Sequence, residues 1–314
     1  IAGIAQFAFQ LPFLHRLRLM PRFTPAWRDP GVRRVLKLMT PAIFGVAVTQ
    51  INLLLDTLIA SFLVSGSISW LYYSDRLLEF PVGVLGVALG TVILPSLSAK
   101  HAEADPGHFA GTLDWAVRWV FLLGVPAAVG LIMLAGPLIS TLFQSRVFDA
   151  HDVEMATRSL TAYSIGLLPF MLIKVLAPGF YARQDTKTPV KIAVVAMLVN
   201  MVMNLVLVWS LKHAGLALAT SLAAATNATL LWVILQRQGI FQPGKPLRRV
   251  VVRAMLASAI MAVMLWQGSG TLESWTTAPL ATKVWRLSLW VGAGASSYFA
   301  LAFLFGIRAR DFRR

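Results

Sequence analysis

Asp75, Arg76 and Glu79 form the clearest candidate for chemistry, because they lie within residues 69–98, which carry no other charge. On a helix, positions three and four apart share a face, so Glu79 would lie beside both Arg76 and Asp75. A guanidinium binds phosphate through paired hydrogen bonds, and charges at membrane depth usually line a substrate path. The cluster predicts an anion site in which Glu79 orients Arg76 and limits its net charge. The alternative is an arginine that snorkels to the membrane interface with its carboxylate partner.

A second polar group predicts a cation site. Asp56 lies in the middle of an apolar run, Asn200 and Asn204 are four apart in another, and Thr220 lies in the next. Carboxylate, amide and hydroxyl oxygens are ligands for hard cations, so these four side chains are candidates to bind Na⁺ or a proton. Hydrogen bonding between helices explains the same pattern equally well. Lys174, the remaining charge in this set, could assist anion binding or pair with an acid.

The composition places these residues in a membrane. Hydrophobic residues make up 57% of the 314 residues, charged residues only 13%, and the mean hydropathy is +0.71. A soluble domain carries about 25% charged residues. The absence of cysteine excludes disulfides, thiolate metal sites and a cysteine nucleophile. We predict no cofactor and no metal site apart from the one for Na⁺.

Uncharged apolar runs of about 20 residues predict the membrane spans and an all-α polytopic protein. The predicted spans are 38–64, 69–98, 115–143, 157–180, 190–211, 215–236, 250–268 and 284–306. Residues 1–14 resemble the end of another span, and the chain opens on Ile1 without a charged leader, so an N-terminal part is expected to be missing. Prolines inside several runs predict kinks.

The charges of the loops alternate along the chain and predict the orientation. One set of connecting segments carries 20 Lys and Arg, and the alternate set carries 5. By the positive-inside rule the first set, which includes the C-terminus, is cytoplasmic. The net charge of +15 is therefore mostly a topology signal, and binding of nucleic acid is not expected.

Several longer motifs resemble one family, the MurJ (MviN) lipid II flippases of the multidrug/oligosaccharidyl-lipid/polysaccharide exporter (MOP) superfamily. The motifs are Trp27-Arg-Asp-Pro-Gly31, Pro41-Ala-Ile-Phe-Gly45, Gln50-Ile-Asn-Leu-Leu-Leu-Asp56, Gly66-Ser-Ile-Ser-Trp70-Leu-Tyr-Tyr-Ser-Asp-Arg76-Leu-Leu-Glu79-Phe-Pro81, Val92-Ile-Leu-Pro95-Ser-Leu-Ser98 and Lys174-Val-Leu-Ala-Pro178-Gly-Phe-Tyr181-Ala-Arg-Gln-Asp185-Thr-Lys-Thr-Pro189-Val-Lys191. They cover most of residues 1–236, whereas residues 250–306 match only as two extra spans.

The resemblance implies a MOP/MATE-like helical bundle of fourteen helices, of which this chain holds the second six-helix lobe and two extra C-terminal helices. The implied parts are the end of the sixth helix of a missing first lobe (1–14), a basic cytoplasmic connector (15–37), the second lobe (38–236), a cytoplasmic loop (237–249), two additional transmembrane helices (250–306) and a basic cytoplasmic tail (307–314).

The resemblance also implies a function, which is flipping of lipid II across the bacterial inner membrane by alternating access, without covalent chemistry. Arg76, with Glu79, Asp75 and Lys174, would bind the substrate, and the last two helices would form a groove for its undecaprenyl tail. Asp56, Asn200, Asn204 and Thr220 fall where the family has a sodium site. An acid can stand at the position of Asn204 there, which puts cation binding in question. The implied partners are lipid II, membrane lipids and the cell-wall synthesis machinery.

Three other functions fit parts of the pattern. A cation-coupled drug or ion antiporter of the same superfamily would use Asp56 for coupling and would need no anion-binding arginine. An intramembrane glycan polymerase or ligase would need a catalytic acid or base, which Glu79 or Asp75 could supply. A structural scaffold would leave the buried acids without a purpose.

Overall fold

The computed structural model describes residues 2–17, 29–102 and 106–308, and the regular structure in these ranges is entirely helical. The chain divides into two units, Ile1–Thr40 and Pro41–Arg314. The first unit contains α1 (Ala2–Arg16) and the start of α2 (Pro30–Ser61). The second unit contains the rest of α2 and every later element, and with them all of the candidate site residues.

The second unit confirms the all-α prediction. Its remaining elements, in chain order, are α3 (Ser67–Pro81), the π-helix η1 (Val82–Val87), α4 (Ala88–Ala102), α5 (Pro106–Met133), α6 (Ala135–Phe143), α7 (Ala150–Ile165), α8 (Leu167–Tyr181), α9 (Lys187–Leu211), α10 (His213–Arg237), α11 (Lys245–Gly268), α12 (Leu272–Thr276) and α13 (Leu280–Leu304). Six stretches among the described residues are long and apolar enough to cross a membrane: Gly107–Met133, Ala150–Tyr181, Lys187–Leu211, His213–Arg237, Pro246–Gly268 and Leu280–Leu304.

Two spans expected to be continuous helices are each divided in the structure. The span predicted at 115–143 is interrupted at Leu134, between α5 and α6, and the span predicted at 157–180 at Gly166, between α7 and α8. In both cases the third residue of the restarted helix is a proline, which has no N–H to bond the carbonyl four residues earlier. The prolines predict kinks in these helices, and each lies beside a one-residue interruption, at Leu134 or at Gly166.

The span predicted at 69–98 also changes character along its length. It consists of α3, the wider turns of η1 and then α4. Pro81 ends α3, because it cannot donate the hydrogen bond that would continue the α-helical ladder, and Gly83 and Gly86 follow in the π-helical turn. The candidate anion site on α3 therefore lies next to an irregular segment, as is frequent at functional sites.

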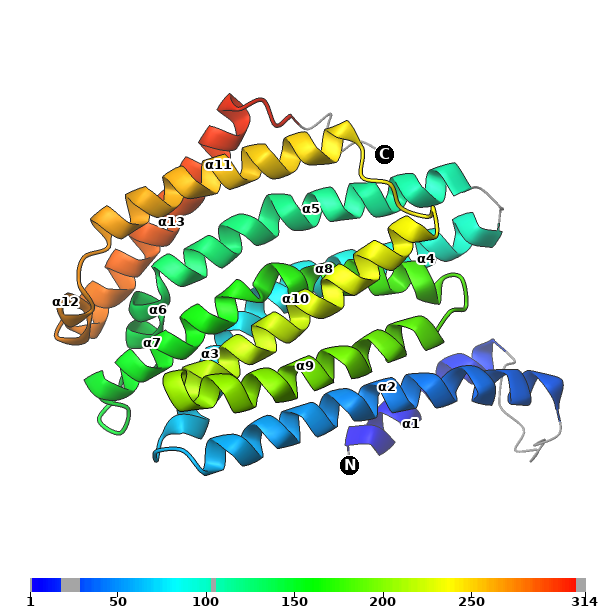
Figure 1. Ribbon diagram of the computed structural model, residues 1–314, viewed down its shortest axis with the longest axis horizontal. Helices are drawn as coiled ribbons and strands as arrows, with labels where there is room; N and C mark the ends of the chain where they lie inside the picture. The colour runs from blue at the N-terminus through cyan, green and yellow to red at the C-terminus, as the bar shows by residue number, and fades with distance from the viewer. Residues whose placement is uncertain (1, 18–28, 103–105, 309–314) are drawn as a thin grey trace. The chain divides into compact units, whose positions relative to one another are not determined.

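Within the second unit, α5 packs against α4 and α8 on one side and against α11 on the other (Figure 1). One buried cluster around Leu113 and Met171 joins α4, α5, α8 and α10. A second, around Leu122 and Tyr298, joins α5 to α11 and α13, and a third around Ile139 joins α3, α6 and α7. These clusters fix α3, α5 and α6 beside the C-terminal helix pair α11 and α13.

Polar contacts attach that helix pair to the rest of the unit. The Tyr298 hydroxyl on α13 donates to the carbonyl of Leu122 on α5 at 2.6 Å. Near the first turn of α13, the Lys283 ammonium donates to Gln144 Oε1 at 2.6 Å, just beyond the end of α6. These two contacts, one near each end of α13, keep that helix close to α5 and α6.

The connectors are more helical than expected. Within the connector predicted at 15–37, α2 already begins at Pro30, while residues 18–28 lie outside the described part. The loop predicted at 237–249 is shortened by α11, which starts at Lys245 with a proline in its first turn. Most of the predicted tail, residues 309–314, also lies outside the described part.

Candidate functional site

Arg76 lies on the exposed face of α3 and pairs with Glu79. Its Nη1 lies 2.5 Å from Glu79 Oε2, and the two side chains are 52% and 57% exposed. The guanidinium also lies over the Tyr72 ring, 4.9 Å from the ring centre. Tyr72, Arg76 and Glu79 are spaced by four and three residues, so one helix face carries all of them. The expected proximity of Arg76 and Glu79 is therefore present, and Tyr72 joins them.

The opposite face of α3 is fixed to α7. Trp70 is buried and its indole nitrogen donates to Asp152 Oδ1 at 2.7 Å. The Ser74 hydroxyl donates to the carbonyl of Ala156 at 2.8 Å. Gly66 adopts φ +100° at the start of α3, and a Cβ there would lie 2.7 Å from the Trp70 ring. These contacts fix the rotation of α3 about its axis, and so the direction in which Arg76 and Glu79 point.

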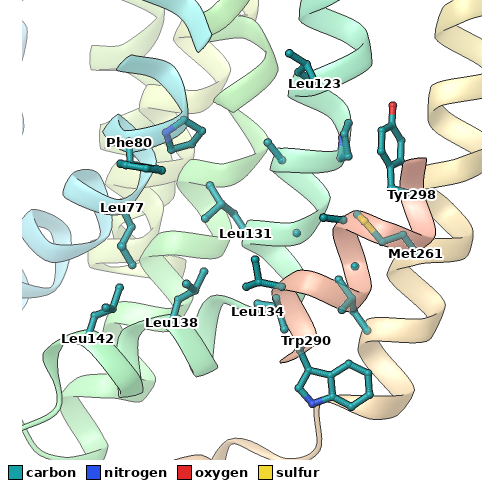
Figure 2. Close-up of a pocket in the computed structure, with 18 of the residues that line it drawn as sticks. Leu77, Phe80, Leu123, Leu131, Leu134, Leu138, Leu142, Met261, Trp290 and Tyr298 are labelled. Atoms are coloured by element: carbon teal, nitrogen blue, oxygen red, sulfur yellow. The ribbon is translucent and has the colours of Figure 1, made fainter. Parts of the chain in front are cut away.

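Arg76 also lies on the wall of an apolar groove. The groove, of about 690 Å³, lies between α3, α5, α6, α11 and α13. Figure 2 shows Leu77 and Phe80 of α3 on one side and Met261 and Trp290 of the C-terminal helix pair on the other. Arg76 is the single charged residue among those that line it. The arrangement places one cation beside a long apolar surface, which suits an amphiphile with an anionic head.

Neither of the other two residues predicted for anion binding forms a hydrogen bond or ion pair with Arg76 in the described part of the chain. Asp75 is half-buried and forms no hydrogen bond or ion pair within the described residues. Lys174 of α8 packs against η1, where its Cγ lies 3.4 Å from the position of a Cβ on Gly86. Gly86 is ten residues beyond Arg76, or about 15 Å along the helix path. No described acid pairs with Lys174, so its role in anion binding stays a prediction.

The second predicted group is assembled from three helices. Asp56 of α2 accepts hydrogen bonds from Asn204 Nδ2 (2.6 Å) on α9, from Thr220 Oγ1 (3.4 Å) on α10 and from Asn52 Nδ2 (3.3 Å) one turn earlier. Asn200, the fifth member, bonds to Asn204 and Thr220. The two amides of α9 are 0–1% exposed. The four residues expected together are therefore together, and Asn52 joins them.

One oxygen atom of this group has no donor. The group has one carboxylate, and Asn204 Oδ1 is buried without a hydrogen-bond partner in the described structure. Rotating the Asn200 amide gives up its bond from Asn204 and lets its nitrogen donate to Asp56 Oδ1 at 3.0 Å. In either orientation the carboxylate is bonded by neutral donors, and Asn204 Oδ1 stays a buried oxygen without a donor. Among the described residues no three His, Asp or Glu side chains gather to hold a metal ion.

Tyr72 and Asn52 were absent from the sequence-based site. Each lies four residues before a charged residue of its own helix, Arg76 or Asp56, and the same spacing rule that paired Arg76 with Glu79 identifies them. The groove residues of α5 and α6 could not be found in this way, because an apolar residue that lines a groove and one that faces lipid look alike in sequence.

Comparison with known proteins gives one family. Residues 1–284 match the family model described as "Lipid II flippase MurJ". The chain is 48% identical to a probable lipid II flippase MurJ of Vibrio cholerae serotype O1, over 100% of this chain and 60% of the relative. It is 42% identical to the lipid II flippase MurJ of Burkholderia cenocepacia, over 100% and 62%. The chain thus spans about three fifths of the length of these curated relatives.

Solved structures agree with the sequence match. A lipid II flippase MurJ in an inward closed conformation superposes with a TM-score of 0.74 at 25% identity, over 97% of this chain and 60% of that one. An outward-facing multidrug resistance MATE transporter of the MOP superfamily gives 0.58 at 16% identity, over 86% and 64%. The second likeness shows the fold alone.

Proposed function

The chain belongs to the lipid II flippase MurJ family, and from this premise we propose that the protein moves lipid II across a bacterial membrane. The substrate is an undecaprenyl-linked pyrophosphate that carries the peptidoglycan precursor. The protein acts as a transporter by alternating access and makes or breaks no bond in the substrate.

The observation that carries the proposal is the position of Arg76 on the wall of the apolar groove. Lipid II has a pyrophosphate between a polar headgroup and a long apolar chain. A guanidinium matches phosphate oxygens in paired hydrogen bonds, and the groove offers apolar side chains of α5, α6, α11 and α13 to the prenyl chain. Arg76 would hold the pyrophosphate, Glu79 and Asp75 would limit the positive charge around it, and the groove would hold the chain.

The membrane arrangement follows from loop charge. The 20-to-5 bias of Lys and Arg favours a cytoplasmic C-terminus. We propose the bacterial inner membrane as the location, with α3 entering from its outer side. Arg76 lies nine residues into α3, or about 14 Å from the start of that helix. The pyrophosphate site would then lie inside the membrane, where only a protein cavity makes a charge affordable.

Asp56, Asn200, Asn204 and Thr220 would hold Na⁺ or a proton through their oxygen atoms. A bound cation would neutralise the Asp56 carboxylate and replace some of the hydrogen bonds that it now accepts. Asp56 lies on α2, and its donors Asn204 and Thr220 lie on α9 and α10. Binding of the cation would therefore change how tightly α2 is held against α9 and α10. Binding of ²³Na⁺ to the purified protein, followed by NMR line broadening, tests this: Asp56→Asn is expected to abolish the broadening, and unchanged broadening would contradict it.

Replacement of Arg76 tests the main proposal. In the full-length protein, Arg76→Ala is expected to reduce lipid II appearance in the outer leaflet by more than tenfold, because the guanidinium supplies the paired charge-assisted bonds. Arg158→Ala is the matched control, since Arg158 forms a similarly exposed helical pair with Glu154 away from the groove. A normal flipping rate for Arg76→Ala would overturn the assignment.

Filling the groove tests the site for the chain. Ala295 lines the groove on α13, so Ala295→Trp is expected to slow flipping of lipid II while headgroup binding is retained. Ala300→Trp is the control, because Ala300 is exposed on the same helix outside the groove. Equal rates for the two variants would exclude the groove as the path of the chain.

The antiporter alternative is not favoured. That alternative uses Asp56 for coupling, and the likeness of 16% identity to a MATE transporter adds support for the fold alone, whereas the family match to lipid II flippases covers residues 1–284. It also gives no purpose to Arg76 on the groove wall.

A further inference from the structure

The guanidinium of Arg76 is already occupied by a carboxylate of its own helix. Glu79 lies at 2.5 Å, the Tyr72 ring lies on another side at 4.9 Å, and these two are the partners that the described structure gives to Arg76. A phosphate that takes both N–H edges of the guanidinium, Nη1 included, must therefore displace Glu79. The proposed substrate site thus holds an internal anion before any ligand arrives.

The Arg76–Glu79 pair is easy to break, but Glu79 stays near Arg76 after the pair breaks. Both side chains are more than half exposed, and exposed pairs at this spacing are weak. Glu79 remains close in any case, because the other face of α3 is fixed through Trp70 and Ser74. A group tethered by a few bonds competes at an effective concentration of about millimolar or more. Glu79 is therefore a permanent competitor of moderate strength.

We propose that Glu79 is a built-in competitor that sets an anionic charge threshold for Arg76: lipid pyrophosphates displace it, and phosphodiester phospholipids do not. Tyr72 positions the guanidinium during the exchange. This inference rests on the proposed function and adds to it a reason why bulk phospholipid leaves Arg76 unoccupied.

The need for a threshold follows from the groove. Its apolar lining accepts the acyl chains of phospholipids as readily as a prenyl chain, and phospholipids are far more abundant in the bilayer. Selection therefore needs an element that disfavours the wrong ligand. A phosphodiester carries one negative charge, as Glu79 does, and gains nothing by exchange. A pyrophosphate diester carries a charge on each phosphorus and can take both N–H edges of the guanidinium.

Tyr72 has a separate part in the exchange. When Glu79 leaves, the aromatic ring remains against the guanidinium, and a cation–π contact needs no counter-charge. The ring therefore holds Arg76 toward the incoming phosphate. Tyr72→Phe is expected to keep this contact, and Tyr72→Leu is expected to raise the KM for lipid II with little change in kcat.

Competition binding tests the proposal. The full-length protein in nanodiscs is titrated with lipid II in the presence of rising phosphatidylglycerol. For Glu79→Gln, inhibition by phosphatidylglycerol is expected to strengthen by about fivefold, the upper range for an exposed pair. Lipid II binding should also tighten while flipping slows, since release now lacks the returning carboxylate. Glu154→Gln is the matched control, because it removes the acid of an exposed Arg–Glu pair outside the groove.

The outcomes separate the inference from the proposed function. If the unaltered protein binds lipid II no better than phosphatidylglycerol, the proposed function fails. If it prefers lipid II and Glu79→Gln leaves the inhibition constant of phosphatidylglycerol unchanged, the charge threshold is wrong. Glu79→Asp provides a second variant, in which a shorter carboxylate is expected to weaken inhibition by phosphatidylglycerol again in part; an inhibition constant equal to that of Glu79→Gln would also overturn the proposal.

Discussion

Arg76 and Asp56 both place a charge on an apolar helix, but their surroundings differ in every respect. Arg76 is paired with Glu79 on its own helix, and both side chains are more than half exposed. Asp56 is bonded to Asn204 and Thr220 on two other helices, and the amide of Asn204 is 0% exposed. One charge is held locally in an open place, and the other is held by tertiary contacts in an enclosed place.

The difference indicates what each group can do. A weak, exposed pair can exchange its partner without disturbing the fold, as a transient substrate requires. A carboxylate bonded to residues of two other helices links its own state to the packing of those helices, as the proposed cation site would need. The comparison predicts that changes near Asp56 act on stability and that changes at Arg76 act on transport.

The largest expected effect is at Asn204. Asn204→Leu removes the shortest hydrogen bond of Asp56 and is expected to destabilise the protein by about 3 kcal/mol, since it leaves a charged acceptor short of a donor. Thermal unfolding in detergent measures it. Asn227→Leu on α10 is the control, because Asn227 makes no hydrogen bond with another described residue. Equal losses of stability in the two variants would mean that the hydrogen bonds around Asp56 contribute no extra stability.

A smaller loss is expected where α10 approaches α9. A Cβ on Gly215 would lie 2.5 Å from the carbonyl oxygen of Leu207. Gly215→Ala is therefore expected to separate the two helices and to cost about 2 kcal/mol, as other forced insertions into packed sites do. Gly292→Ala is the control, since nothing lies within 4 Å of its Cβ position, and it should raise stability slightly. If both variants raised the stability of the protein, the close approach of α10 to α9 at Gly215 would not contribute to the packing around Asp56.

The smallest change in stability is expected at Arg76. Arg76→Gln removes an exposed pair of one helix and should leave the unfolding midpoint unchanged, even where the proposed transport is reduced. The same unfolding assay, run beside Arg158→Gln, measures it. A clear drop in the unfolding midpoint for Arg76→Gln but not for Arg158→Gln would show that the Arg76 pair also contributes to stability, as the Asp56 network is expected to do.

The sequence predicted most of the Arg76 site and four of the five residues of the Asp56 group. Arg76 and Glu79 were paired from helical spacing, and the helix ladder that carries them needs no distant contact. Asp56, Asn200, Asn204 and Thr220 were grouped by the oxygen chemistry of polar side chains in apolar runs, and the family resemblance points to the same four; helical spacing joins only Asn200 to Asn204. The interruptions at Leu134 and Gly166 lie beside prolines from which kinks are predicted, because a proline removes one hydrogen bond; the neighbouring helices decide how far the path then bends.

Local chemistry therefore determined the helical class of the chain, its apolar spans and the spacing of Tyr72, Arg76 and Glu79, since all of these depend on neighbours within two turns. Tertiary structure decided the rest. It set the face of α3 that is open, through the bonds of Trp70 and Ser74 to α7. It also formed the groove, because α5, α6, α11 and α13 must meet α3 before an apolar surface becomes a binding site. The spacing of residues along the sequence does not show which distant helices come into contact; the packing of the folded chain decides it.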